Sequence, residues 1–327
     1  MSVLVFAENW EGKFKKPAQE ALTYGYELAQ KTGGPLCAVV IGHNIQGDEI
    51  NKLGAYGCPK VLSAIAPAFA SFSANIYATV IADAAKKENA THIVFSHTYT
   101  GKSVAPRVAV KLQAGLAAGA VSLPSSPEPF IVRKKCFSGK GFTDVQISSP
   151  VKIVSLSPNS HHVFAAGEHK AADFKIEEFN PALPASDTTV NEVKKTSGKV
   201  VLTEAEIVVS GGRGLKGPEN WGMVEALADA LGAATACSKP VADMGWRPHH
   251  EHVGQTGITI APNLYIAIGI SGAIQHLAGV SSSKVMVAIN TDKEAPFFQA
   301  ADYGIIGDAF DVVPKLTEAI KQLKSAH

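Results

Sequence analysis

Short apolar runs alternate with segments of helical periodicity along the first 120 residues, and this alternation constrains the fold more than any other feature of the sequence. The predicted strands are residues 3–7, 36–41, 61–64 and 92–96. The predicted helices are residues 17–31, 48–53, 73–87 and 103–112. Strands that alternate with helices in this way are typical of βαβ units, so the pattern predicts a parallel α/β sheet.

Two of these helices carry recognisable end signals. Pro17 opens the helix at residues 17–31, and Gly33-Gly34 follows its end, which is the usual position for each residue type. In the helix at residues 103–112, Ser103 is the predicted N-cap and Pro106 lies in the first turn.

The pattern changes after Ala120. Residues 130–137 and 141–147 flank a glycine-containing turn and predict a β-hairpin, and residues 151–156 add another strand. Residues 158–199 are polar, with prolines, threonines and an aspartate close together. Such a stretch predicts a connection between domains, which here includes one strand at residues 174–179.

A second α/β pattern begins near residue 200. The predicted strands are residues 206–210, 233–236, 258–261, 265–270 and 285–290, with a further strand near Ile305. The predicted helices are residues 218–231, 272–277 and 313–324. A length of 327 residues favours two domains. We therefore predict an α/β chain with domains at residues 1–195 and 196–327, each built on a mainly parallel sheet, the second being doubly wound and Rossmann-like.

Composition excludes several classes of protein. Hydrophobic residues make up 46% and charged residues 18% of the chain, which is typical of a globular core. A formal net charge of +1 argues against a nucleic-acid partner. The apolar run at residues 264–274 is too short to span a bilayer, and the N-terminus lacks the basic region of a signal peptide. These features predict a cytoplasmic protein, or a mitochondrial matrix protein in a mature eukaryotic form.

Residues 253–276 contain two loops suited to ligand binding. A glycine-flanked polar loop at residues 254–257 precedes the apolar run at residues 264–270, and Ser271-Gly272 then opens a short segment that carries His276. Loops at the carboxyl edge of open α/β sheets bind ligands, so this stretch predicts a ligand site.

Residues 212–217 match the G-x-G-x-x-G pattern of dinucleotide-binding turns. The match lacks its second half, because Cys237, Ser238 and Lys239 follow the next strand where an acidic ribose ligand is expected. The turn also contains Arg213 and Lys216, so we predict an anion-binding turn rather than an NAD site.

No metal site and no catalytic dyad are predicted. Residues 249–252 read His-His-Glu-His, but adjacent histidines on an extended loop point apart. None of the four cysteines forms a CxxC pair, and no GxSxG elbow occurs. A cofactor-type site without an acid/base pair suits electron transfer, so we expect an electron carrier with no substrate turnover of its own.

Several long segments resemble the α subunit of electron transfer flavoproteins. They are SGGRGLKGPEN at residues 210–220, VGQTG at 253–257, APNLYIAIGISGAIQHLAG at 261–279 and VAINTDKEAPFFQAADYGIIGD at 287–308. The resemblance extends more loosely to the N-terminal half, through the LVFAE start and residues 92–112. It implies a heterodimer with a β subunit, in which the C-terminal domain binds FAD. It also implies electron flow from flavin dehydrogenases, such as the acyl-CoA dehydrogenases of fatty acid β-oxidation, to a quinone reductase or another acceptor.

The resemblance also implies which residues surround the FAD. These are Arg213, Ser238, Lys239, Val253, Gly254, Gln255, Thr256, Ser271, Gly272, Ala273, Ile274, Gln275, His276, Asn290, Asp308 and Ala309. By the same resemblance Lys239, Thr256 and His276 tune the flavin potential, since a cation or a histidine donor beside the N1 and O2 edge stabilises the negative charge of the reduced ring. Many relatives have arginine where Lys239 stands; lysine keeps the charge but loses the planar fork.

Two other functions stay open at this point. One is an enzyme domain of the same C-terminal fold that binds NAD or thiamine diphosphate. The other is a structural subunit that has lost its cofactor. The missing acidic ribose ligand argues against NAD, and the intact loops at residues 254–257 and 271–276 argue against cofactor loss.

Overall fold

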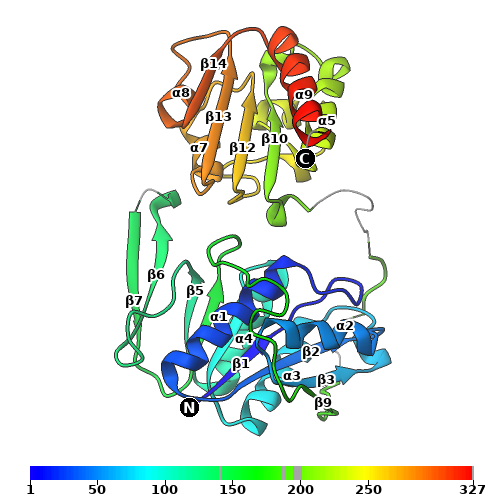
Figure 1. Cartoon of the computed structure of the whole chain (residues 1–327), viewed down its shortest axis with the longest axis vertical. Coiled ribbons are helices and arrows are strands. Elements are labelled where there is room, and N and C mark those ends of the chain that lie inside the picture. The colour runs from blue at the N-terminus through cyan, green and yellow to red at the C-terminus, as the bar shows by residue number, and fades with distance from the viewer. Residues whose placement is uncertain (140, 186–188, 194–200, 326–327) are drawn as a thin grey trace. The chain divides into compact units, whose positions relative to one another are not determined.

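The computed structural model describes residues 1–139, 141–185, 189–193 and 201–325 (Figure 1). The chain separates into two compact units. The first comprises Met1–Cys136 and Phe142–Lys194, and the second comprises Phe137–Gly141 and Lys195–His327. The predicted domain boundary between residues 195 and 196 lies outside the described residues.

A mainly parallel sheet forms the centre of the first unit. Within the described residues its strand order is β7-β6-β5-β8-β4-β1-β2-β3-β9, and β6 runs antiparallel to β5. The strands are β1 (Ser2–Phe6), β2 (Leu36–Gly42), β3 (Lys60–Ile65), β4 (Ala90–Ser96), β5 (Gly115–Ala120), β6 (Phe130–Cys136), β7 (Gly141–Ile147), β8 (Lys152–Leu156) and β9 (Lys175–Glu178). The predicted hairpin is thus the adjacent pair β6 and β7.

Helices cover both faces of this sheet. They are α1 (Lys16–Thr32), α2 (Gly47–Asn51), α3 (Ala74–Lys87) and α4 (Tyr99–Leu112). Leu22 of α1 belongs to one apolar cluster with Val3 and Val5 of β1. Ile81 of α3 belongs to the cluster on the opposite face with Leu4. Successive residues of β1 therefore contribute to opposite cores, as the two-residue period of a strand requires.

The second unit contains an all-parallel sheet with the strand order β11-β10-β12-β13-β14. The strands are β10 (Ile207–Gly211), β11 (Ala234–Cys237), β12 (Leu264–Ile268), β13 (Val285–Asn290) and β14 (Tyr303–Ile306). The helices are α5 (Gly222–Leu231), α6 (Lys239–Asp243), α7 (Ile274–Val280), α8 (Phe297–Ala300) and α9 (Ala309–Ser325).

Helices flank this second sheet on both faces, which confirms the predicted doubly wound fold (Figure 1). Ile266 and Ile268 pack with the helices α5 and α9, whereas Tyr265 and Ala267 pack with α7 and α8. The chain leaves β10 for one neighbour, β11, and then returns to pair β12 on the other side of β10. This reversal makes the carboxyl ends of β10 and β12 a topological switch point, where open α/β sheets bind ligands.

Three sequence predictions differ from the structure. Helix α4 begins at Tyr99 and not at Ser103, because Thr98 is the N-cap and its hydroxyl accepts from the Gly101 amide at 3.0 Å. Strand β5 was not predicted, since its sequence GLAAGA has almost no β-branched or aromatic residues. Residues 258–261 form no strand; Ile258 makes only an isolated bridge with Val253.

Candidate functional site

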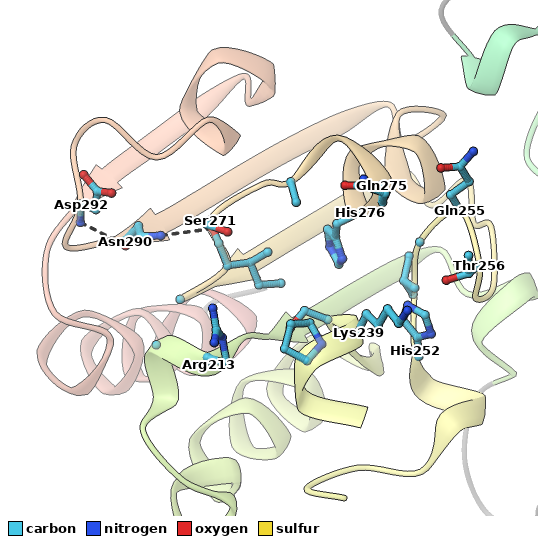
Figure 2. A pocket seen from close by; sticks show the side chains of 18 residues that line it. Arg213, Lys239, His252, Gln255, Thr256, Ser271, Gln275, His276, Asn290 and Asp292 are labelled. Carbon is cyan, nitrogen blue, oxygen red and sulfur yellow. Dashed lines mark hydrogen bonds between the residues drawn. The ribbon is translucent and has the colours of Figure 1, made fainter. Parts of the chain in front are cut away.

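A cleft of about 510 Å³ lies at the switch point of the second sheet (Figure 2). Its walls come from the loops that follow the carboxyl ends of four parallel strands. Arg213 follows β10, Lys239 follows β11, Ser271 follows β12, and Asn290 ends β13. Such a volume is typical of a site for a small molecule or cofactor.

Twelve of the sixteen residues predicted to surround a cofactor line this cleft. They are Arg213, Ser238, Lys239, Val253, Gly254, Gln255, Thr256, Ser271, Ala273, Gln275, His276 and Asn290. In Figure 2, Asn290 lies at one end of the cleft and Gln255 and Thr256 lie at the other. Segments separated by more than seventy residues of sequence are therefore brought to one site by the parallel sheet.

Four predicted residues do not line the cleft: Gly272, Ile274, Asp308 and Ala309. Asp308 has other partners, since its carboxylate accepts from the Phe310 amide at 3.0 Å and lies 3.6 Å from the Lys216 ammonium. It thereby caps the start of α9, which Ala309 begins. Ile274 begins α7, and its side chain is 60% exposed.

Six lining residues were missed by sequence analysis: Gly214, Pro240, His252, Gly269, Ile270 and Asp292. Gly214 and Gly269 lie in contact across the loops that follow β10 and β12. A Cβ on Gly214 would lie 2.6 Å from the Gly269 Cα, and Gly269 itself has φ +62°. Only glycine allows both the close approach and that backbone conformation, so the GxG pattern has a packing role here.

The glycine-rich turn does not form the predicted anion-binding loop. The amides of Gly212 and Gly214 donate to the carbonyls of Ile268 and Gly269, and the amides of residues 215–217 donate within the turn. Lys216 lies beside Asp308 and over the Phe310 ring, at 4.7 Å from the ring centroid. The turn therefore contributes the Arg213 side chain to the cleft rather than a nest of free amides.

Free backbone donors lie instead before α7. Among the described residues, the amides of Gly272, Ala273, Ile274 and Gln275 donate no hydrogen bond. The opening segment of a helix leaves such amides without intrahelical acceptors. These donors flank the cleft beside Ser271 and can serve acceptor oxygens of a bound ligand.

His276 is a buried residue in the wall of the cleft. Its Nε2 lies 2.8 Å from the Tyr265 hydroxyl, and its Nδ1 is also buried and makes no hydrogen bond of standard geometry within the described residues, although a contact with the Val253 backbone acts to raise the pKa of the ring. Burial, helped by the nearby His252, lowers the pKa of His276 to about 4. The imidazole is therefore neutral near pH 7. When the Tyr265 hydroxyl donates to Nε2, the imidazole proton is on Nδ1.

Two cations line the same cleft. Arg213 and Lys239 are both exposed, and neither has a hydrogen bond or ion pair to any described residue. His252 lies close by and is buried; burial lowers its pKa, with the Lys239 charge acting in the same direction. The cleft thus offers positive charge from two side chains and neutral imidazoles from two others.

The His-His-Glu-His segment forms no group of three metal ligands within the described residues. Glu251 is buried and receives two hydrogen bonds from Arg247, at 2.8 and 2.7 Å. His252 turns into the cleft, whereas His249 and His250 are exposed. No helix of the described residues is long and apolar enough to cross a membrane.

The residues at the cleft fit FAD. Arg213 can neutralise phosphate oxygens, Lys239 can place a positive charge beside the ring, and the amides before α7 can bind ring or phosphate oxygens.

Comparison with known proteins gives the same assignment over the whole chain. A family model described as "Electron transfer flavoprotein domain" matches residues 3–184, and one described as "Electron transfer flavoprotein FAD-binding domain" matches residues 201–281. The electron transfer flavoprotein subunit alpha of Bacillus subtilis is 39% identical over 322 residues, covering 98% of both chains. That of Pseudomonas aeruginosa is 39% identical over 321 residues, covering 98% of this chain and 100% of its own.

A third relative, from Syntrophomonas wolfei, is 36% identical over 323 residues and covers 97% of this chain and 98% of its own. The similarity includes both units and every loop that lines the cleft. The chain therefore belongs to the electron transfer flavoprotein α-subunit family, and its C-terminal unit is an FAD-binding domain.

Proposed function

We propose that this chain is the FAD-binding subunit of a cytoplasmic electron carrier, in which it pairs with a β subunit. The complex accepts electrons from flavin dehydrogenases, such as acyl-CoA dehydrogenases, and delivers them to a quinone reductase or another acceptor. Family membership supports the cofactor and the β partner. The resemblance of the C-terminal segments supports the donor and acceptor classes.

The convergence of twelve residues implied by the family resemblance on one cleft is the observation that carries this proposal. These residues come from loops that follow four parallel strands, at the switch point where such sheets bind ligands. Tyr265 holds the His276 imidazole in the wall of this cleft, with its hydroxyl 2.8 Å from Nε2.

Bound FAD supplies the electron-transfer chemistry, and the chain supplies its surroundings. His276 is neutral near pH 7, because burial lowers its pKa to about 4, and it carries its proton on Nδ1 when the Tyr265 hydroxyl donates to Nε2. Lys239 is the permanent cation beside the flavin and favours its reduced, negatively charged form. Thr256 offers a hydroxyl donor at the same end of the cleft, and Arg213 holds phosphate oxygens.

The alternative of an NAD- or thiamine-diphosphate-binding enzyme has less support. Ser238 and Lys239 follow β11 where an NAD site needs an acidic side chain. Loss of the cofactor is also disfavoured, because twelve of the residues implied by the family resemblance line one cleft.

Co-expression with the β subunit tests the function directly. The purified complex should be yellow and release one FAD per chain on denaturation, and its flavin absorbance should bleach when an acyl-CoA dehydrogenase reduced by substrate is added. A complex without releasable FAD would refute cofactor binding. A complex that holds FAD but accepts no electrons from any flavin dehydrogenase would refute the carrier role alone.

Substitution of Lys239 should change the potential of the bound FAD. We expect Lys239→Ala to lower the midpoint potential by up to about 40 mV, because an exposed charge contributes up to about 1 kcal/mol and 59 mV corresponds to 1.4 kcal/mol for one electron. Lys239→Arg should retain most of the potential. Spectroelectrochemical titration measures both, and Lys315→Ala on α9 removes an equally exposed lysine outside the cleft as a control. Equal potentials in the Lys239→Ala and Lys315→Ala proteins would exclude the role.

A further inference from the structure

Glu27, His161 and His162 form a compact group in the first unit, whereas the residues that line the FAD cleft all belong to the second unit. The Nε2 of His162 lies 2.9 Å from one Glu27 oxygen, and the Nε2 of His161 lies 3.7 Å from the other. One ligand atom from each of the three residues lies within 4.8 Å of the other two. Two imidazoles and a carboxylate thus point at one small volume.

The convergence of adjacent histidines needs an explanation, because neighbours on an extended chain point apart. Here the chain turns directly after β8, where the Ser160 hydroxyl donates to the Ser157 carbonyl at 2.5 Å. Helix α1 then anchors the turn at two points. Glu20 accepts from the Asn159 amide at 3.1 Å, and Thr23 accepts from the Phe164 amide at 3.5 Å.

The two anchors and Glu27 lie on one face of α1. Positions 20, 23 and 27 are separated by three and four residues, which is the spacing of neighbours along a helix surface. The backbone of the turn is therefore fixed along the same stripe of α1 that ends in Glu27. With the backbone of the turn held in this way, the imidazoles of His161 and His162 both lie beside the Glu27 carboxylate.

His161 is the member of the group that lacks a partner. Its side chain is 9% exposed, and its Nε2 is buried without a hydrogen bond to any described residue. The 3.7 Å separation from Glu27 exceeds hydrogen-bond distance. An ordinary ion pair between His162 and Glu27 explains two members of the group but leaves this buried nitrogen unpaired.

Aromatic neighbours hold the two imidazoles in place. Tyr24 contacts the His161 ring edge-on at 5.3 Å between centroids, and Phe164 contacts the His162 ring at 5.3 Å. Burial and the neighbouring His162 lower the pKa of His161 to about 4.

We propose that Glu27, His161 and His162 bind a divalent transition-metal ion, of which Zn²⁺ is the best match. In tetrahedral zinc sites the ligand atoms are separated by about 3.4 Å, as follows from metal–ligand distances near 2.1 Å. The observed separations of 2.9 and 3.7 Å lie on either side of this value. His162 is 58% exposed, so the fourth position is open to water.

The ion would link the turn after β8 to helix α1 and pair the buried nitrogen of His161. Imidazole and carboxylate are both ligands that Zn²⁺ accepts, and three protein ligands with one water are a common zinc coordination. The adjacent pair His249-His250 gives an internal comparison, since both side chains are exposed and have no carboxylate partner in such a group.

Calorimetric titration of the FAD-loaded complex with ZnCl2 tests this site, after removal of affinity tags and dialysis against a chelator. We expect one Zn²⁺ per α chain, with a rise in melting temperature on binding. His162→Gln and Glu27→Gln should each weaken binding by roughly a hundredfold or more, since even groups behind metal ligands contribute about 10–100-fold. The double variant His249→Gln, His250→Gln should bind Zn²⁺ as the unchanged protein does.

His162→Gln is the decisive variant, because its exposed side chain is the least needed for folding. Circular dichroism and FAD content should stay unchanged in it, so that a loss of Zn²⁺ binding reports the ligand and not the fold. The proposal is overturned by the absence of saturable Zn²⁺ binding, by unchanged affinity in His162→Gln, or by loss of binding in the His249/His250 variant.

Discussion

Gly279→Ala is expected to weaken FAD binding at least tenfold, although alanine is the better helix former. Gly279 lies in α7, and a Cβ added there would lie 2.5 Å from both the amide nitrogen and the Cα of Gly254. Helix propensity alone would favour alanine by about 1 kcal/mol. Because a separation of 2.5 Å is far shorter than van der Waals contact, the added Cβ must push the loop at residues 254–257 away from α7. This loop carries Gln255 and Thr256, which line the cleft.

The contacted atoms belong to the Gly254 backbone, which moves less easily than the end of a flexible side chain. The added methyl group should therefore lower the free energy of unfolding by about 1–3 kcal/mol or displace the loop at residues 254–257. Displacement also breaks the hydrogen bond from the Gln255 amide to the Gln275 carbonyl, which is 2.7 Å long. FAD per chain after gel filtration, and the FAD dissociation constant of the apo complex by flavin fluorescence, measure the effect. We expect at least a tenfold weaker affinity, which corresponds to about 1.4 kcal/mol.

Gly222→Ala is the matched control. Gly222 begins α5, has ordinary helical φ of −54°, and an added Cβ would meet nothing within 4 Å. This variant should keep its FAD and gain slightly in stability. If Gly279→Ala keeps FAD as well as Gly222→Ala does, the close packing of α7 on the Gly254 loop has no role in the site.

Arg247→Ala should destabilise the second unit by about 3 kcal/mol. Arg247 donates two hydrogen bonds to Glu251, lies 3.4 Å from Glu225, and covers the Trp221 ring at 5.1 Å. The Arg247 and Glu251 side chains are only 17% and 8% exposed. Removal of one partner leaves a buried charge unpaired, which costs about 3–5 kcal/mol, and the partial exposure of Arg247 places the effect at the lower end.

Urea unfolding followed by tryptophan fluorescence measures this change, because Trp221 and Trp246 both lie in the second unit. Arg247→Lys should recover only part of the loss, since lysine cannot form the two parallel hydrogen bonds. His252 follows Glu251 directly and lines the cleft. The Arg247→Ala protein should therefore also release FAD at lower urea than the unchanged protein.

Arg133→Ala provides the comparison. Arg133 makes the same two-bond contact with Asp144, at 2.8 and 2.9 Å, and lies over the Phe142 ring, but the two side chains are 54% and 49% exposed. Water replaces such a pair at little cost, so no measurable change in unfolding is expected. If Arg247→Ala and Arg133→Ala lower the free energy of unfolding equally, burial does not determine the strength of these ion pairs.

Local sequence was sufficient for most of the fold. Apolar β-branched runs predicted most of the strands, and helical periodicity predicted most of the helices that flank the sheets. Each signal arises because an element must bury apolar residues at the repeat of its own secondary structure. Where the signal was weak, the prediction was wrong. Strand β5 is made of glycine and alanine, and its place between β6 and β8 depends on its neighbours rather than on its own propensity. Ser103 was the predicted cap of α4, but the helix begins one turn earlier and Thr98 is its N-cap.

The residues of the cleft divide in the same way between those that sequence predicted and those that only the tertiary structure revealed. The glycine-rich loops, the apolar strand between them and the histidine that follows are local in sequence and predicted a ligand site, and the family resemblance of the C-terminal motifs identified twelve of the lining residues. His252 and Asp292 had no local signal. The neutral state of His276 also could not be foreseen, since its lowered pKa follows from burial and from the nearby His252.

The sequence by itself therefore determined the fold class, the family and the loops that surround FAD, because these depend on periodicity and on contiguous motifs. Only the tertiary structure decided which polar atoms meet. It joined His276 to Tyr265, Arg247 to Glu251, and the pair His161-His162 to Glu27, more than 130 residues away. Hydrogen bonds and charges act over a few ångströms, and the separation of two residues along a chain does not reveal whether folding will bring them within that distance.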